Sequence, residues 1–420
     1  MNNFKRWTNI AGWSVFAIAF LGYFLSVERT GSVWDCGEFV TGAYKLEVVH
    51  PPGAALFLII GRMFTLLAEI FSSNPSDIAF AVNLSSGMCS AFAAMFICWI
   101  TIILGKLALL GRQAEPNPGE QMALAGAGLV AGLATAFSTS IWFSAVEGEV
   151  YAMSTFFTAL TFWATIKWYN LPDQPQNDRW LVFALYAAAL SIGVHLLSIL
   201  TFPALALFYY FKKYRDHSLQ GMAASALAGL GVMYVIQKVV IVGIPTLWSH
   251  LDLLMVNELG MPINSGVFPL VLILASIVVF GLRWAHQNQS ALAQHLFVGA
   301  ALVMLAFSTI GVVVIRANAN TPINMNNPNN PFQLITYLNR EQYGERPLLK
   351  GPHFDAPVVE TDVKDRYGRV GDRYEVIDRK ITPIYKDSDE TFFPRMGHQD
   401  DARKVQYRRW MGVSTDLSKP

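Results

Sequence analysis

The chain has 420 residues, of which 53% are hydrophobic and 15% are charged, and its formal net charge is +1. Ordinary soluble proteins carry about 25% charged residues, so these values exclude a typical soluble domain and indicate a membrane protein. A near-neutral chain without a basic stripe is not expected to bind nucleic acid, and its three cysteines suit neither a disulfide framework nor a zinc site.

The charged residues divide the chain into two predicted domains. Residues 1–315 hold 14 of the 31 Lys and Arg residues and 15 of the 30 Asp and Glu residues, which leaves 17 and 15 for the last 105 positions. We therefore predict an apolar membrane domain over 1–315 and a hydrophilic tail over 316–420.

Nine apolar runs predict helices that cross a bilayer about 30 Å thick. In chain order they cover residues 10–27, 79–104, 122–140, 151–168, 180–194, 196–211, 221–244, 267–283 and 292–315. Lys5 and Arg6 precede the first run and no small-x-small cleavage site follows it, so we predict a retained helix and not a cleaved signal peptide.

A further run, residues 53–71, carries Arg62 at its centre, where a charge facing lipid is unfavourable. If this run crossed the membrane, the basic loops that follow would move outside, against the positive-inside rule. We therefore predict a juxtamembrane helix in the outer interface, within a long first outer loop over 28–78. The N-terminus is then cytoplasmic and the tail extracytoplasmic.

The first outer loop contains the motif WDCGEF, residues 34–39. Asp35 and Glu38 are three positions apart, so both carboxylates would lie on one face of a short helix. A partly shielded carboxylate at the membrane surface suits a general base. The pair could equally bind a divalent cation weakly. In the non-functional alternative, the loop is simply solvated and Asp35 caps a helix.

The same loop continues with His50-Pro51-Pro52-Gly53, a rigid turn before the interfacial run. Prolines at a helix entry are ordinary and need no functional explanation. His50 and Arg62 form a cationic pair near the headgroups, which predicts phosphate binding. A purely structural role for His50 is the alternative.

The second outer loop, residues 142–154, places Glu147 and Glu149 close to Trp142 and Tyr151. Residues two apart point away from each other on a helix, so we expect one of the two acids to face the first loop. These acids could also have no function and only reflect the positive-inside bias, because basic residues collect in the inner loops and leave acidic ones in the outer loops.

Three further ionisable residues lie in or beside predicted helices: His195, Lys238 and Arg316. An ionisable residue within the membrane is by default a functional-site hypothesis. Snorkelling to the headgroups would explain Lys238 and Arg316 as well. The sequence contains no phosphate-binding Gly-rich motif and no metal-ligand spacing that would indicate a metal site.

The tail opens with an Asn- and Pro-rich stretch, residues 317–331, which favours turns. Phe332, Ile335 and Leu338 then share one face of a predicted short helix. From residue 344 onward, charged and aromatic residues alternate with Gly and Pro, which predicts a loop-rich segment.

The motif WDCGEF followed by KLEVVHPPGAALFLIIGR resembles a family of multi-pass proteins, the TMEM260-like protein O-mannosyltransferases, in the Bacteroidetes-type branch with its own domain of unknown function. AVEGEVYAMSTFF and IRANANTPINMNNPNNPFQLITYLNREQYGERPL extend the resemblance into the tail. It implies a GT-C glycosyltransferase fold: an all-α polytopic bundle with juxtamembrane helices in the first outer loop. Members are often longer, so we expect either a short member or a piece of one.

The resemblance also implies the activity that we expect. This is an inverting transfer of a sugar, mannose above all, from a polyprenyl-phosphate donor to Ser or Thr of exported proteins, in a bacterial inner membrane. Asp35 would be the base and Glu38 a supporting acid. The donor phosphate would face cations drawn from His50, Arg62, His195, Lys238 and Arg316. The sugar or acceptor would contact Trp34, Trp142, Glu147, Glu149 and Tyr151.

A related activity and two other classes of function remain open at this point. One of these classes is a non-enzymatic membrane scaffold, but a scaffold would need no clustered WDCGEF and HPPG loop. A related GT-C enzyme could glycosylate a lipid or a glycan instead of a protein. A transporter or flippase would place ionisable residues near the bilayer midplane and build its helices from paired repeats, neither of which the sequence shows. No firm cofactor and no oligomeric state are indicated.

Overall fold

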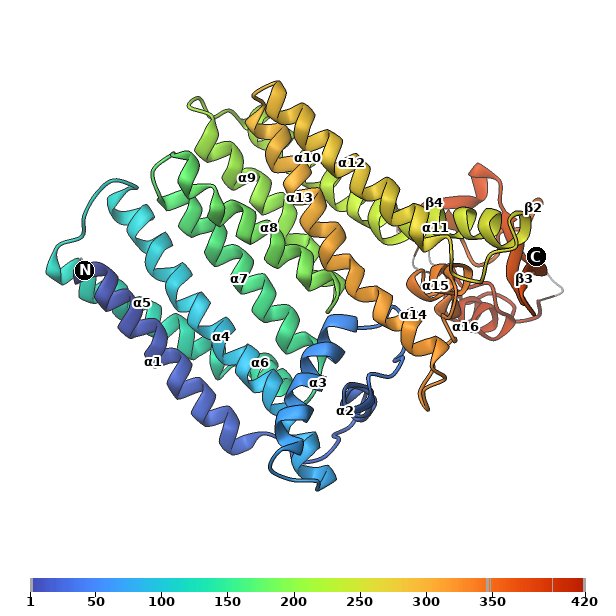
Figure 1. Cartoon of the computed structure of the whole chain (residues 1–420), viewed down its shortest axis with the longest axis horizontal. Coiled ribbons are helices and arrows are strands. Elements are labelled where there is room, and N and C mark those ends of the chain that lie inside the picture. Colours follow the sequence, from blue (N-terminus) through green and yellow to red (C-terminus); the bar gives the residue numbers. More distant parts are fainter. Residues whose placement is uncertain (1–2, 345–346, 348, 395, 418–420) are drawn as a thin grey trace.

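The computed structural model describes residues 3–344, 347, 349–394 and 396–417, with the side chain of residue 198 left out. Apolar helices form a bundle in which α1, α4, α7, α8 and α13 pack in succession and lie side by side (Figure 1). The helices of the bundle are α1 (Asn3–Ser26), α4 (Pro75–Leu110), α5 (Pro118–Ala136), α6 (Thr139–Ala145), α7 (Val150–Asn170), α8 (Arg179–Ile192), α9 (Phe202–Lys213), α10 (Leu219–Val235), α11 (Ile244–Leu253), α12 (Val267–Gln287), α13 (Ala291–Phe307) and α14 (Gly311–Asn318).

Within the described residues, five helices are long and apolar enough to cross a membrane, or six if the bent pair α5 and α6 forms one span. The five are Asn3–Ser26, Pro75–Leu110, Leu219–Glu258, Val267–Gln287 and Ala291–Asn318, and each contains one of the predicted runs or most of it. The all-α membrane fold is therefore confirmed, with fewer spans than the nine that the sequence predicts.

The number of spans is lower than predicted because several predicted runs are broken or too short in the structure. The predicted run 122–140 is divided between α5 and α6, whose axes differ by 63°. The runs 180–194 and 196–211 form α8, of 14 residues, and a 3₁₀ turn followed by α9, of 12 residues. Helices of that length reach only about 20 Å, which is short of a bilayer. The helix α7 is longer but contains Lys167 and several polar residues.

Helix starts follow ordinary capping chemistry. Asn74 precedes Pro75, and its side chain accepts a hydrogen bond from the backbone N of Ser76 at 3.0 Å. Asn117 and Glu120 form a reciprocal capping box at the start of α5. These caps satisfy backbone N–H groups that a helix leaves unpaired, which fixes where each span begins.

The predicted juxtamembrane run forms α3 (Ala55–Glu69), a helix of 15 residues that is too short to be among the candidate spans. Its inner face packs on α2 (Cys36–Lys45) and α4, and Gly61 permits this contact because a Cβ there would lie 2.7 Å from the Cβ of Ala43. Met63, Leu67 and Phe71 are exposed on or beside its other face. Together α2 and α3 lie at one end of the bundle (Figure 1).

The tail begins with turns in which Asn320, Asn326 and Asn327 adopt left-handed backbone conformations, as Asn tolerates. The predicted short helix is α15 (Pro331–Leu338). The prediction of a loop-rich segment after it is incomplete. It misses two antiparallel strand pairs, β1 (Lys350–Pro352) with β4 (Glu390–Phe392) and β2 (Glu360–Val370) with β3 (Arg373–Ile384), and the helix α16 (Asp401–Met411).

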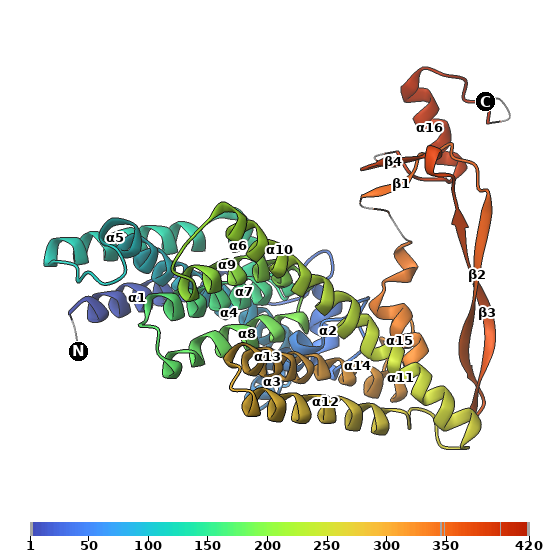
Figure 2. The same ribbon diagram turned by 90° about the horizontal axis from the view of Figure 1, so that it is seen from above.

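The β2–β3 ribbon is fixed to the bundle at the end of α11 (Figure 2). The buried carboxylate of Asp252 accepts hydrogen bonds from the Tyr374 hydroxyl at 2.6 Å and from the backbone N of Gly266 at 2.6 Å. The side chain of Asn257 pairs with both backbone groups of Tyr374. These contacts hold the start of β3 in one place relative to the membrane helices.

Candidate active site

The segment between α1 and α4 folds so that its two predicted acids share one side of α2. Asp35 is the N-cap residue of this helix and Glu38 lies in its first turn. Asp35 is the more exposed of the two, with 58% of its side chain accessible, against 24% for Glu38. The spacing of three therefore does what the sequence predicts, because it brings both carboxylates to the same helix end.

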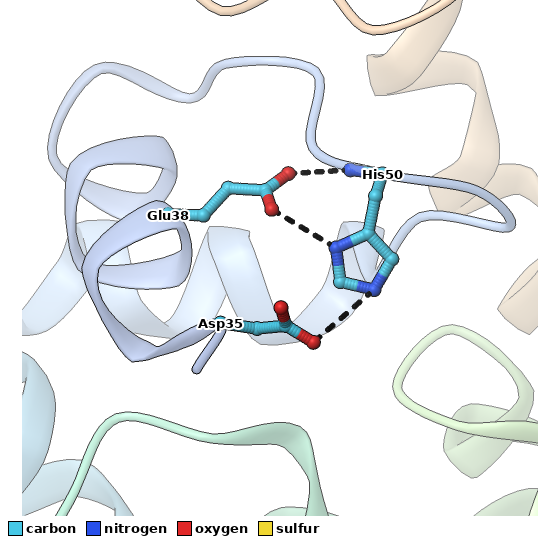
Figure 3. Close-up of side chains that lie close together, drawn as sticks. All are labelled: Asp35, Glu38 and His50. Carbon is cyan, nitrogen blue, oxygen red and sulfur yellow. Dashed lines mark hydrogen bonds and ion pairs between the residues drawn. The ribbon is translucent and has the colours of Figure 1, made fainter. Parts of the chain in front are cut away.

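His50 reaches these acids from the loop that follows α2. Its backbone N donates to Glu38 Oε1 at 2.6 Å, and its ring Nδ1 lies 3.1 Å from Glu38 Oε2 (Figure 3). Its Nε2 lies 3.9 Å from Asp35 Oδ2. The Phe39 ring packs edge-on against the imidazole at a centroid distance of 5.4 Å. The result is a Glu38–His50–Asp35 array with the imidazole between two carboxylates.

The electrostatics of this array favour a charged imidazole. The hydrogen bond to Glu38 raises the pKa of His50, burial opposes this, and the charges of Glu38, Asp35 and Glu149 add to the increase. Burial alone would raise the pKa of Glu38, but the hydrogen bonds and charge of His50 lower it overall. The array thus favours a His cation next to a carboxylate anion, because each charge stabilises the other.

A third acid faces the array from the segment between α6 and α7. Glu149 is the N-cap residue of α7 and is buried, as is Glu147. Ser32 donates a hydrogen bond to Glu147, whereas Glu149 interacts electrostatically with Asp35 and His50. Burial first, and then the charges of Asp35 and Glu147, raise the pKa of Glu149 to about 7.

This pKa predicts how Glu149 affects stability. The folded-state pKa of Glu149, about 7, lies above the ordinary value of 4.5. Between these two pH values the folded chain keeps the proton on Glu149, whereas the unfolded chain has lost it. The free energy of unfolding therefore falls as pH rises through this interval. Glu149→Gln should therefore stabilise the chain at pH 8, by about 3 kcal/mol, and have little effect at pH 4.5. Thermal unfolding in detergent at both pH values measures this difference. An equal effect at both would contradict the assignment.

The predicted aromatic residues lie in different surroundings. Trp142 packs against Tyr23 and Phe137, with centroid distances of 5.5 and 5.7 Å. Trp34 has a left-handed backbone and is 85% exposed. Tyr151 is half-exposed and lies one helix turn or less from Glu149, so it is the predicted aromatic residue best placed to contact a substrate beside the array.

His195 contacts this same Tyr151, with ring centroids 5.4 Å apart. Its Nδ1 accepts a hydrogen bond from the backbone N of Leu197, and burial followed by the charge of Arg340 lowers its pKa. His195 is therefore held as a neutral ring at neutral pH. Lys238 is exposed in a π-helical turn, Ile236–Gly243, and no contact with the array is found for it within the described residues.

Arg62 and Arg316 lie at the opposite end of α2 from Asp35. Arg62 donates to the carbonyl O of Tyr44 at 2.6 Å, and Arg316 donates to those of Lys45 and Leu46 at 2.9 and 2.7 Å. These are carbonyls that a helix end leaves unpaired. A 10-residue helix is about 15 Å long, so neither guanidinium lies beside Asp35.

The same two arginines border a cavity of about 510 Å³. Its remaining walls come from the end of α2 and from the turn after α14, namely Tyr44, Lys45, Leu46, Ala319, Asn320, Thr321 and Pro322. Arg62 is also paired with Glu69 at 3.3 Å. Of the five predicted phosphate-binding cations, the structure thus brings only His50 to the acids.

Asp35, Glu38 and His50 are also the one group among the described residues whose potential metal-ligand atoms converge, all within 4.8 Å of one another. Carboxylate oxygens and an imidazole suit several divalent ions. In the observed arrangement Nδ1 of His50 is bonded to Glu38, so a cation would have to displace that hydrogen bond.

Comparison with known proteins places the array at the start of a recognised domain. Residues 35–218 match the family model described as the Protein O-mannosyl-transferase TMEM260 N-terminal domain. Residues 344–420 match a Family of unknown function (DUF8416). No solved structure is significantly similar to the chain.

Two curated proteins are similar to part of the chain. A Protein O-mannosyl-transferase tmem260 of Dictyostelium discoideum is 28% identical over 146 residues, which are 35% of this chain and 15% of that protein. The Protein O-mannosyl-transferase TMEM260 of Mus musculus is 25% identical over 179 residues, 43% of this chain and 22% of the relative. The similarity thus spans less than a quarter of the length of either relative.

Proposed function

We propose that this chain is a TMEM260-like membrane glycosyltransferase that transfers mannose to Ser or Thr hydroxyls of exported proteins. The observation that carries the proposal is the convergence of Asp35, Glu38 and His50 at the beginning of the matched region. The names of the relatives support the sugar and the type of acceptor.

In the proposed reaction, the acceptor hydroxyl oxygen attacks the anomeric carbon while its proton passes to the Asp35 carboxylate. The bond between that carbon and the phosphate oxygen breaks, and the phosphate leaves with the electron pair. Asp35 suits the role of base because it is the most exposed member of the array. A single displacement of this kind inverts the anomeric configuration.

His50 would stabilise the charge that develops on the departing phosphate. Glu38 holds its Nδ1, which leaves Nε2 directed to the side of Asp35. A preorganised cation beside a developing negative charge lowers the barrier most effectively when it is already in place. Phosphate leaves as an anion and needs no proton, so a charged imidazole suffices.

We further propose that the donor is a polyprenyl phosphate sugar and that the site opens to the extracytoplasmic side of a bacterial inner membrane. The apolar helices around the array would accommodate an isoprenoid chain. The tail contacts the backbone beside the array, because Tyr337 bonds to the carbonyl of Val49, so we infer that tail and site share one side. The charge asymmetry of the loops supports placing that side outside.

The proposal predicts which donor the enzyme uses. Purified chain in lipid nanodiscs, supplied with a Ser/Thr-containing peptide, should transfer labelled mannose from polyprenyl-phosphate mannose and not from a nucleotide-linked mannose. Mass spectrometry of the peptide identifies the modified hydroxyl. Labelling of an added lipid or glycan with the peptide left unmodified would refute the protein acceptor, and transfer from the nucleotide sugar alone would refute the donor.

A further inference from the structure

A segment far along the chain holds the backbone of the loop that carries His50. Val48 and the residues around 324 form a parallel bridge, in which the Val48 N donates to the Ile323 carbonyl at 3.0 Å and the Met325 N donates to the Val48 carbonyl at 3.0 Å. Arg316 holds the preceding carbonyls of Lys45 and Leu46. We call residues 316–337 the clamp segment.

Tyr337 completes the clamp segment next to His50 itself. Its side chain is 1% exposed, and its hydroxyl donates to the carbonyl O of Val49 and lies 3.5 Å from that of His50. The hydroxyl also touches Gly53, where a Cβ would lie 2.7 Å away and where the backbone φ is +75°. The phenol therefore fits between both ends of the turn that presents the imidazole.

The helix that carries Tyr337 is itself well anchored. Asn330 caps α15 by accepting hydrogen bonds from the backbone N of Phe332 and of Gln333. Leu334 and Leu338 are buried in the same apolar cluster as Val48. A capped helix with a buried face holds its side chains in fixed positions, so the phenol is a rigid support and not a mobile contact.

We propose that Tyr337 is a positioning residue for His50, and that the clamp segment is part of the active site although it lies outside the matched residues 35–218. The backbone N and the ring of His50 both bond to Glu38, so a shift of the Val49–His50 peptide moves the imidazole away from Glu38. The kinetic consequence rests on the proposed transferase function, whereas the structural consequence does not.

Tyr337→Phe tests the proposal because it removes the hydroxyl and keeps the ring. Misplacement of a catalytic group by about 1 Å can lower a rate roughly 100-fold, and a partial shift should lower kcat about tenfold. KM for the donor should stay within about twofold, since the Tyr337 side chain is buried away from the surface that a substrate can reach. Tyr343→Phe is the matched control, because Tyr343 is half-exposed and packs on Arg340.

A second measurement is independent of activity. In the 420-residue chain labelled with ¹⁵N-histidine, the Nδ1 signal of His50 reports the hydrogen bond to Glu38. The signal is assigned by its loss in His50→Gln. Tyr337→Phe should shift this signal and Tyr343→Phe should not. Arg316→Gln releases the other end of the clamp segment and should also shift the His50 signal. This variant replaces Tyr337→Phe in the experiment if Tyr337→Phe does not fold.

The outcomes separate the inference from the proposed function. A His50 signal that is unchanged in Tyr337→Phe overturns the positioning role, whatever the kinetics. A raised KM with unchanged kcat would also overturn it, because that indicates substrate contact. If the wild-type chain transfers no sugar from any donor, the proposed function fails, while the signal still decides whether Tyr337 positions His50.

Discussion

Replacement of Asp35 by Asn is expected to lower kcat for mannose transfer by about 10³-fold, because general acid–base catalysis contributes roughly 10²–10⁴-fold and an amide cannot accept the hydroxyl proton. KM for the donor should change little, since the substitution preserves shape. Asp35 is largely exposed at the helix start, so the variant should fold normally. Initial rates with polyprenyl-phosphate mannose and peptide measure the effect.

Asp77→Asn provides the matched control for this experiment. Asp77 is also an acid in the first turn of a helix of the same loop region, but it pairs with Arg29 and Ser72 and makes no contact with the array among the described residues. Its substitution should leave the rate unchanged. A rate for Asp35→Asn within about threefold of wild type would remove Asp35 as the base and direct attention to Glu149.

The second large effect is expected for Glu38→Gln, which should lower kcat about 100-fold at alkaline pH and less at acidic pH. Glu38 provides the main contribution that raises the pKa of His50. Activity that requires the cation persists until pH rises through that pKa and is lost above it. Without the carboxylate the pKa returns toward 6.5, so the loss of activity should begin at lower pH.

The pH profile of kcat measures this shift, with Glu258→Gln as a control acid that is exposed and distant in the chain. Other groups that face His50 titrate too, because Asp35 and Glu149 both influence its pKa. An alkaline limb that is identical in wild type and Glu38→Gln would assign that limb to a group other than His50. A uniform decrease at all pH values would indicate that Glu38 acts through geometry alone.

Part of the site was predictable because it depends on local spacing. Asp35 and Glu38 share a helix face for the same reason that any residues three apart do. His50 was predicted as a cation near phosphate, but its bond to Glu38 was not, because that contact depends on how the turn after α2 folds back. Glu147 and Glu149 were predicted to diverge, and of the two Glu149 interacts with the array.

The arginines illustrate the opposite case. A cation in an apolar run is compatible with lipid, with phosphate or with a helix end, and the sequence does not distinguish these partners. In the structure, Arg62 donates a hydrogen bond to the carbonyl of Tyr44, and Arg316 donates to the carbonyls of Lys45 and Leu46. Their role as direct phosphate ligands remains a proposal, and the distance along α2 argues against contact with a sugar phosphate at Asp35.

The sequence by itself determined the membrane class, the apolar helices, the short helix around Arg62 and the WDCGEF loop, because each depends on the residue pattern within one segment. Only the tertiary structure decided which helices are too short to span, and that residues 316–337 support His50. The support comes largely from backbone hydrogen bonds such as those between Val48 and Ile323, and from one tyrosine hydroxyl 287 positions away from His50. Any residue supplies a backbone carbonyl, so pairing of this kind leaves no pattern in the sequence.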